Sequence, residues 1–152
     1  MSDVNGNPVF KAYAATTAGI IDGRGLAGFE MINGSAGSDV IYAGDGGSQL
    51  WGGADNVTDI LVGGNGADIF IGGRTQGADF FLNASAADLV HLNDTTLSDI
   101  VATAEENGTI GIAFNTGNVI AVQSSEAYSA AFMLADGSTY RYNHANKSWQ
   151  NA

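Results

Sequence analysis

Residues 63–71 of the chain read Gly-Gly-Asn-Gly-Ala-Asp-Ile-Phe-Ile. They fit, at every defined position, the nine-residue template glycine–glycine–x–glycine–x–aspartate–x–apolar–x. Glycines allow positive φ and let carbonyl groups converge, and the residues after the aspartate alternate between the two faces of a strand. The segment therefore predicts a tight turn followed by a short strand whose apolar residue, Phe70, points inwards.

The same pattern recurs on both sides of this segment. Residues 34–42 are a close copy, and residues 43–51 are a copy with Ser48 where the aspartate belongs. Four other copies have gained two residues or lost glycines: 23–33, 52–62, 72–82 and 83–91. The acidic position is occupied in turn by Glu30, Asp39, Ser48, Asp59, Asp68, Asp79 and Asp88. The apolar position is occupied by Ile32, Ile41, Leu50, Leu61, Phe70, Phe81 and Val90. Seven units in register predict a solenoid.

Two units make one coil, so each unit is expected to stack on the next but one, at the strand spacing of roughly 4.8 Å. The acidic positions then form two columns, one with Asp39, Asp59 and Asp79, the other with Glu30, Ser48, Asp68 and Asp88. Carboxylates stacked this closely repel one another unless a divalent cation lies between coils. Calcium suits such a site because it accepts six to eight oxygen ligands in flexible geometry, whereas magnesium requires a strict octahedron and zinc prefers His or Cys.

These repeats resemble the RTX (repeats-in-toxin, hemolysin-type) calcium-binding family, whose nonapeptides form a right-handed parallel β-roll. The resemblance covers residues 23–91 and implies an all-β fold with calcium as its cofactor. It implies side-chain ligands at Asp39, Asp59, Asp68 and Asp79. It also implies carbonyl ligands in the turns, at Gly34, Ala36, Gly52, Gly63, Asn65 and Gly72.

Three features depart from the family pattern. Ser48 has no charge, so the site between Ser48 and Asp68 is expected to be weaker. The insertions at 55–57 and 74–76 are expected to distort their turns. Asp55 either adds an oxygen ligand or is merely solvated, and the sequence leaves both readings open.

Composition excludes several classes of protein. The chain has 152 residues, 22 of them glycine, and no cysteine, which excludes a disulfide scaffold. Sixteen acidic residues against five basic ones give a net charge of −11, so we expect no nucleic-acid partner. We expect no membrane span, because no apolar run approaches the ~20 residues that one needs. Residues 1–7 have neither the basic region nor the apolar core of a Sec-type signal peptide.

We expect three regions: an N-terminal cap at 1–22, the calcium-binding roll at 23–91 and a β-rich C-terminal cap at 92–152. Short β-like pieces such as Val9-Phe10 and Ile20-Ile21 suit a cap over the first coil. In the C-terminal region, hairpins are predicted around 115–118 and 136–137, with a last strand near 147–150. Residues 97–104 are ambiguous between helix and strand, and the whole cap is expected to pack on the end of the roll.

The function predicted is a non-enzymatic calcium-binding module that folds on calcium after export. No nucleophile elbow or His-Glu-x-x-His motif is present in the sequence, and His91 and His144 are expected to be ordinary surface or partly buried residues. The resemblance implies a secreted, extracellular or surface-attached bacterial parent, such as an adhesin, a surface or matrix protein, or a toxin. It also implies type I secretion machinery as a partner, with a signal within about 100–152. Two alternatives remain: a self-associating structural protein of a surface layer or fibre, and the accessory C-terminal domain of a secreted enzyme.

Overall fold

The computed structural model describes residues 11–25, 28, 30–124 and 130–152. Within them the chain forms strands and one turn of 3-10 helix, η1 (Leu97–Asp99). In this part of the chain no helix is long and apolar enough to cross a bilayer. The pair Val9-Phe10, expected in the N-terminal cap, lies outside the described residues.

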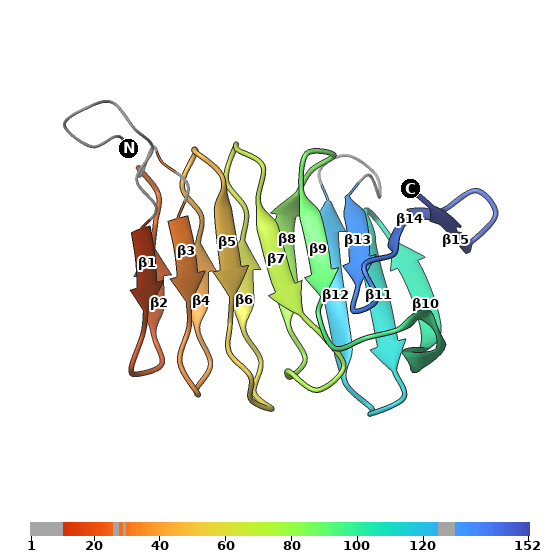
Figure 1. Ribbon diagram of the computed structural model, residues 1–152, viewed down its shortest axis with the longest axis horizontal. Coiled ribbons are helices and arrows are strands. Elements are labelled where there is room, and N and C mark those ends of the chain that lie inside the picture. The colour runs from red at the N-terminus through yellow and green to blue at the C-terminus, as the bar shows by residue number, and fades with distance from the viewer. Residues whose placement is uncertain (1–10, 26–27, 29, 125–129) are drawn as a thin grey trace.

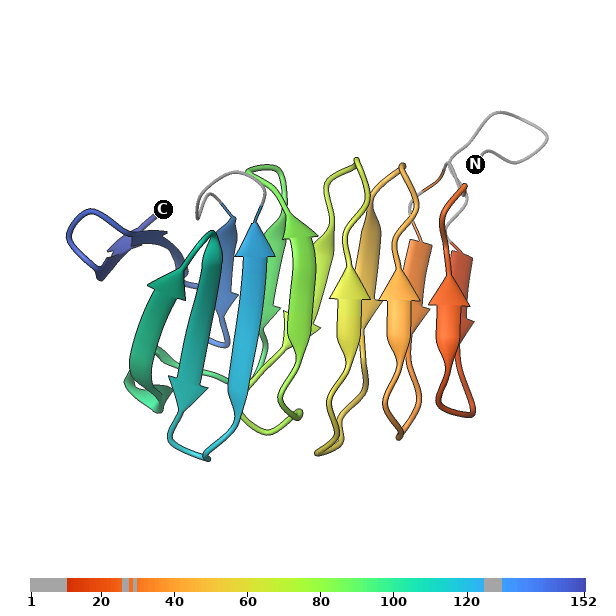
Figure 2. The same cartoon turned by 180° about the vertical axis from the view of Figure 1, so that it is seen from behind.

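The strands of the repeat region are short and evenly spaced (Figure 1). They are β1 (Lys11–Ala14), β2 (Ile20–Asp22), β3 (Glu30–Asn33), β4 (Val40–Tyr42), β5 (Ser48–Trp51), β6 (Ile60–Val62), β7 (Ile69–Gly72), β8 (Phe80–Ala84) and β9 (Leu89–Leu92). Odd-numbered strands pair in parallel in one sheet and even-numbered strands in a second sheet, which Figure 2 shows from its own side. Each strand therefore pairs with the next but one, as the repeat predicts, and the chain forms a parallel β-solenoid of about four turns.

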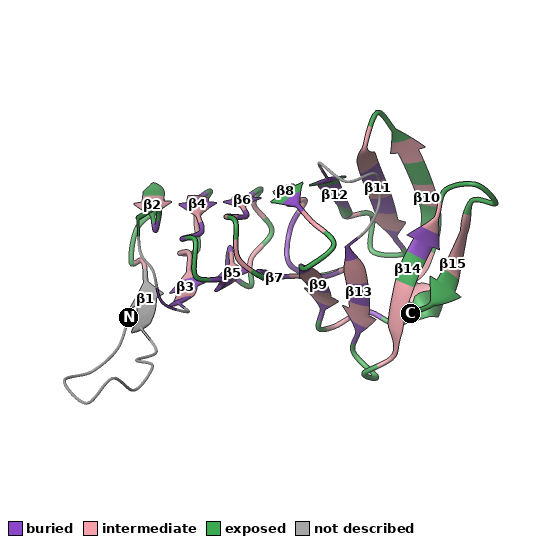
Figure 3. Cartoon of the chain, turned by 90° about the horizontal axis from the view of Figure 1, so that it is seen from above, coloured by how far each residue is buried: buried purple, intermediate pink, exposed green. Residues whose placement is uncertain are grey.

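The apolar positions of the repeat form the core of the roll. In the odd sheet Ile32 pairs with Leu50, Leu50 with Phe70, and Phe70 with Val90. The even sheet aligns its own residues of this kind in the same way, and all seven are 0% exposed: Ile32, Ile41, Leu50, Leu61, Phe70, Phe81 and Val90. Across the roll the rings of Phe70 and Phe81 stack with centroids 5.4 Å apart. Figure 3 looks along the strands and shows the two rows that enclose this core.

The C-terminal extension, which we define as residues 93–152, continues both sheets of the roll. Its strands are β10 (Ile100–Glu106), β11 (Thr109–Phe114), β12 (Val119–Ser124), β13 (Ala131–Leu134), β14 (Thr139–Asn143) and β15 (Ser148–Asn151). Strand β12 pairs in parallel with β8, and β13 pairs in parallel with β9. The remaining pairs, β10–β11–β12 and β13–β14–β15, are antiparallel.

The hairpins of the extension are added strand by strand to the two sheets of the roll. Both predicted hairpins are present, and the ambiguous segment 97–104 divides into η1 and the start of β10. Trp149 closes the gap between the sheets, since its ring contacts Phe132 edge-on at 4.9 Å and its Nε1–H donates to Thr103 Oγ1 (3.1 Å). The fold class predicted from the repeat, an all-β parallel β-roll, is confirmed.

Candidate calcium-binding site

The turns of the roll lie along two edges. Edge A, at the bottom of Figure 1, holds the turns that follow odd-numbered strands: 15–19, 34–39, 52–59 and 73–79. Edge B, at the top, holds the turns that follow even-numbered strands, of which 43–47, 63–68 and 85–88 are described throughout. Each turn on one edge stacks on the turn one coil earlier, so residues about 20 apart in sequence become neighbours.

The acidic positions form the two predicted columns, one along each edge. Asp39, Asp59 and Asp79 follow edge A, whereas Glu30, Ser48, Asp68 and Asp88 follow edge B. All seven side chains are buried. Burial of so many acidic groups is unusual, because carboxylates are almost never fully buried unless they are paired.

One oxygen of four of the five aspartates in these columns, all except Asp68, extends the sheet ladder by accepting an N–H from the preceding coil. The Gly19 N–H donates to Asp39 Oδ1 (2.8 Å), and the Asp39 N–H donates to Asp59 Oδ1 (2.8 Å). The Asp59 N–H donates in turn to Asp79 Oδ1 (3.0 Å). On edge B, the Asp68 N–H donates to Asp88 Oδ1 (2.8 Å). Sequence reasoning missed this role, because the template marks the aspartate but not its partner one coil away.

The other oxygen differs from one aspartate to the next. Asp39 Oδ2 accepts from the Ser35 N–H (2.6 Å), and Asp88 Oδ2 accepts from the Ser85 N–H (2.6 Å). By contrast, five buried side-chain oxygens among the described residues of the roll have no hydrogen-bond partner: Glu30 Oε2, Ser48 Oγ, Asp55 Oδ2, Asp59 Oδ2 and Asp68 Oδ1. A buried acceptor without a partner costs about 1–3 kcal/mol, and more when it is charged. Buried oxygens that accept no hydrogen bond are free to bind a hard cation. Calcium takes oxygen ligands, so the residues along these turns fit calcium.

Burial makes the charged form of these aspartates unfavourable. Burial raises the pKa of Asp59 to about 6, and the Asp39 N–H only partly offsets the rise. Burial likewise raises the pKa of Asp68 to about 6. The pKa of Asp79 rises to about 7, chiefly through burial, with the charges of Asp59 and Asp55 adding to the effect. A divalent cation favours the ionised form and would reverse these shifts.

Glycines bring backbone oxygens close to the carboxylates. A Cβ on Gly52 would lie 2.0 Å from Asp59 Oδ2, and one on Gly34 would lie 2.2 Å from the Gly52 carbonyl oxygen. Consecutive turns of edge A therefore touch through their backbones, and a larger residue at either position would separate them. Two of the expected carbonyl ligands, those of Gly34 and Gly52, are thus in this stack.

The other expected carbonyl ligands are placed less uniformly. Ala36 is exposed in its turn on edge A. On edge B, the Gly63 carbonyl accepts from Asn83 Nδ2 (2.9 Å), and the Asn65 side chain donates to Asp45 Oδ1 (3.0 Å). Gly72 ends β7, where a Cβ would lie 2.6 Å from the Phe81 ring, so core packing alone accounts for this glycine.

No group of three or more His, Cys, Asp or Glu side chains converges on one point within the described residues. An ion bound along either edge would therefore take most of its ligands from carbonyl oxygens. Calcium accepts such a mixed set, since carboxylates and backbone carbonyls both serve as its ligands.

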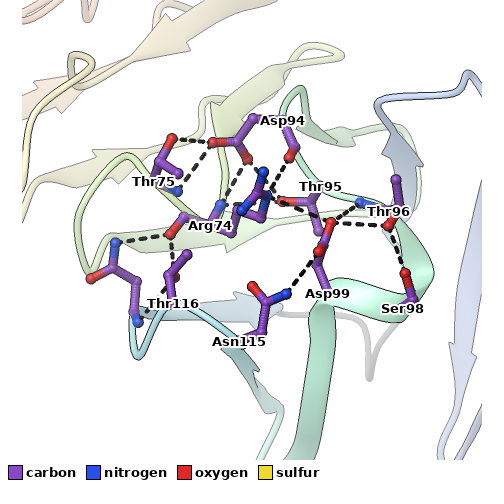
Figure 4. A network of polar contacts seen from close by, with 10 residues as sticks. Arg74, Thr75, Asp94, Thr95, Thr96, Ser98, Asp99, Asn115 and Thr116 are labelled. Atoms are coloured by element: carbon purple, nitrogen blue, oxygen red, sulfur yellow. Dashed lines mark hydrogen bonds and ion pairs between the residues drawn. The ribbon is translucent and has the colours of Figure 1, made fainter.

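The end of edge A is closed by a polar network without a free carboxylate oxygen (Figure 4). Asp94, just after β9, accepts from the Arg74 N–H at Oδ1 (2.8 Å) and from the Thr75 N–H at Oδ2 (3.1 Å). The Arg74 Nε–H donates to the Asp94 carbonyl (2.8 Å) and lies 3.5 Å from Asp99 Oδ2. Although burial alone would raise it, the pKa of Asp94 is lowered by hydrogen bonds from Thr75 and Thr95. The 74–76 insertion thus joins the last turn of edge A to the extension, a role that its sequence did not indicate.

Comparison with known proteins agrees with this geometry. Residues 24–59 and 49–81 match the family model of the RTX calcium-binding nonapeptide repeat, which comprises four copies. The comparisons with curated proteins and with solved structures gave no match. The repeats are therefore RTX repeats, as predicted, and this part of the chain is a calcium-binding β-roll. An RTX β-roll is a structural module rather than a catalytic one, and proteins that carry RTX repeats are typically exported.

Proposed function

We propose that the chain is a non-enzymatic module of an exported protein, and that its roll folds when it meets calcium outside the cell. One observation carries the proposal: Asp59 and Asp68 are at most 1% exposed, yet each has a carboxylate oxygen without a hydrogen-bond partner. Their raised pKa values have burial as the main cause. Without a cation these groups disfavour the folded roll at neutral pH, and with calcium they stabilise it.

The ligands that we propose follow from the two edges. On edge A they are the side chains of Asp39, Asp59 and Asp79 with the carbonyls of Gly34, Ala36 and Gly52. On edge B they are the side chain of Asp68 with the carbonyls of Gly63 and Asn65. Asp39 is the weakest of the side-chain ligands, because both of its oxygens already accept N–H bonds. Gly72 is included as a calcium ligand only through its carbonyl oxygen, which lies beside edge A.

Calcium supplies the folding trigger in this proposal. Extracellular calcium modules bind with Kd on the order of 10⁻⁴–10⁻³ M, which lies far above cytosolic free calcium. Because calcium binds the folded roll alone, it stabilises the fold by mass action. The chain would remain largely unfolded before export through type I secretion machinery and become rigid afterwards. An adhesin, a surface or matrix protein, or a toxin would each use such a rigid terminal module, at the cell surface or in solution, and a secreted enzyme would use it as an accessory domain.

The test is a calcium titration followed by far-UV circular dichroism, with magnesium as the control and a chelator to reverse the change. The expected result is a calcium-specific, reversible gain of strand signal. A signal that a chelator leaves unchanged would contradict the proposal.

A second candidate function, self-association, is supported by the outer face of the even sheet. Ile20, Val40, Ile60 and Phe80 lie opposite one another on successive strands, with Ile20 74% and Phe80 44% exposed. Moreover, among the strands that the structure describes, β1 and β2 are the terminal strands of their sheets, and terminal strands tend to pair with other chains. Sedimentation velocity with and without calcium separates the two functions: a steady monomer favours the module, and a calcium-dependent rise in mass favours assembly.

A further inference from the structure

We propose that Asp55, which lies in the insertion at 55–57, is an additional calcium ligand, and that the turn 52–59 therefore binds its ion with two carboxylates. This inference rests on the proposed function and makes this turn the tightest calcium site of the roll.

Two unpartnered oxygens of this turn carry the inference. Asp59 is 0% exposed, and its Oδ2 has no hydrogen-bond partner, although its Oδ1 accepts from the Asp39 N–H. Asp55 Oδ1 accepts from the Val57 N–H (2.9 Å), whereas Asp55 Oδ2 is buried and has no partner. The hydrogen bond from the Val57 N–H satisfies one oxygen of Asp55. The second oxygen is buried without a hydrogen bond, and a bound cation would compensate for the loss of its hydration.

The two oxygens border the same glycine pair. A Cβ on Gly52 would lie 2.0 Å from Asp59 Oδ2, and a Cβ on the adjacent Gly53 would lie 3.0 Å from Asp55 Oδ2. That same Cβ on Gly53 would lie 2.4 Å from the Ser35 carbonyl oxygen, which belongs to the preceding turn of edge A. Asp55 Oδ2 and the Ser35 carbonyl oxygen thus lie beside Gly53, and Asp59 Oδ2 lies beside the adjacent Gly52; we call this contact between consecutive coils the glycine cradle.

Charge supports the same placement. The carboxylate of Asp55 is close enough to raise the pKa of both Asp59 and Asp79, in addition to the larger effect of burial. Three acidic groups on two successive turns would repel one another when ionised. A divalent ion in the cradle would turn that repulsion into attraction.

The other turns of edge A and edge B offer fewer carboxylate oxygens that are free to bind calcium. The turn 34–39 has a single carboxylate, and both of its oxygens accept N–H bonds. In the turn 63–68, Asp68 is the one acidic residue, and Asp45 across from it is engaged by Asn65. Since calcium affinity is tuned by the number of charged ligands, the turn 52–59 is expected to fill first.

The test uses the full chain and separates the charge of Asp55 from its turn-forming role. Asp55→Asn keeps an acceptor for the Val57 N–H but removes the charge, whereas Asp55→Glu keeps the charge but lengthens the side chain. Asp136→Asn, on an exposed hairpin of the extension, is the matched charge control. Calcium affinity and stoichiometry are measured by calorimetry and by competition with a chromophoric chelator, and circular dichroism at saturating calcium confirms that each variant folds.

The expected result is that Asp55→Asn weakens the tightest ion at least tenfold. Asp55→Glu should retain more of the affinity, and Asp136→Asn should match the unaltered chain. The inference is overturned if Asp55→Asn binds calcium normally and Asp55→Glu binds it poorly. That result would mean that calcium affinity depends on the turn-forming hydrogen bond of Asp55 and not on its charge. Failure of the proposed function gives a different result, because then the unaltered chain and Asp136→Asn would bind no calcium either.

Discussion

The effect of Asp59→Asn on the free energy of unfolding should change sign with calcium. The substitution should stabilise the calcium-free roll and destabilise the calcium-loaded roll. Asparagine keeps an acceptor oxygen for the Asp39 N–H but carries no charge. In the calcium-free roll, the substitution removes a buried carboxylate whose Oδ2 has no partner. In the loaded roll, it removes a ligand.

The size of the effect follows from the raised pKa. Burial raises the pKa of Asp59 from 3.8 to about 6, and each unit corresponds to about 1.4 kcal/mol. Solvent screening at the edge of the roll reduces the resulting cost to about 1–3 kcal/mol at pH 7.5. Because the folded pKa lies above the unfolded one, this cost is absent below pH ~4 and grows as the pH rises through ~6. With calcium at about 100 times Kd, loss of one bound ion costs about 2.7 kcal/mol.

The assay is urea unfolding followed by far-UV circular dichroism, in chelator and in calcium, at pH 7.5 and pH 5. A stabilising osmolyte in both arms keeps the calcium-free roll folded. Asp136→Asn serves again as the charge control. In chelator, the gain from Asp59→Asn should shrink at pH 5, where most of the native carboxylate is already protonated. If Asp59→Asn lowers stability equally in chelator and in calcium, Asp59 is neither an unfavourable buried charge nor a calcium ligand.

Three further predictions concern the edges of the roll. Calcium-free protein should gain strand signal as the pH falls from 8 to 5, because burial raises the pKa values of Asp59 and Asp79 to about 6 and 7; a fall in signal would refute this. Gly52→Ala should impair calcium-induced folding, since its Cβ would lie 2.0 Å from Asp59 Oδ2, whereas Gly19→Ala has no atom within 4 Å to meet and should not. Asp94→Ala should lower stability by about 1–3 kcal/mol to the same extent in calcium and in magnesium, measured by thermal unfolding; a loss confined to calcium would show that Asp94 binds the ion.

The repeat predicted the core of the roll residue by residue. Period and template together identified which side chains point inwards, and positions such as Leu61 and Phe70 are 0% exposed as expected. The two acidic columns followed from the same register, because two units per coil leave no other stacking. Local periodicity determines these features, so they can be read from one chain.

The features that could not be predicted depend on contacts between distant residues. Turn signals indicated the hairpins of the extension but not that β12 would pair with β8. The hydrogen bond from the Arg74 N–H to Asp94 closes the end of edge A. It joins residues 20 apart in sequence, and the repeat template says nothing about either of them. For Asp55, the sequence left two readings open, and the burial of its Oδ2 favours a ligand.

The hydrogen bonds between aspartates give the roll a direction. Each donor N–H belongs to the earlier coil and each acceptor carboxylate to the later one, as in the bond from Asp59 to Asp79. Deleting the first coil would leave Asp39 Oδ1 without its donor, which water can replace. Deleting the last coil would strip acceptors from the Asp59 and Asp68 N–H groups, and orphaned buried amides are rarely tolerated. The main-chain ladder joins the coils in both directions, with the Val40 N–H donating back to Gly19 and the Ala43 N–H donating forward to Val62, so it is the aspartate bonds that make each coil depend on the one that follows it.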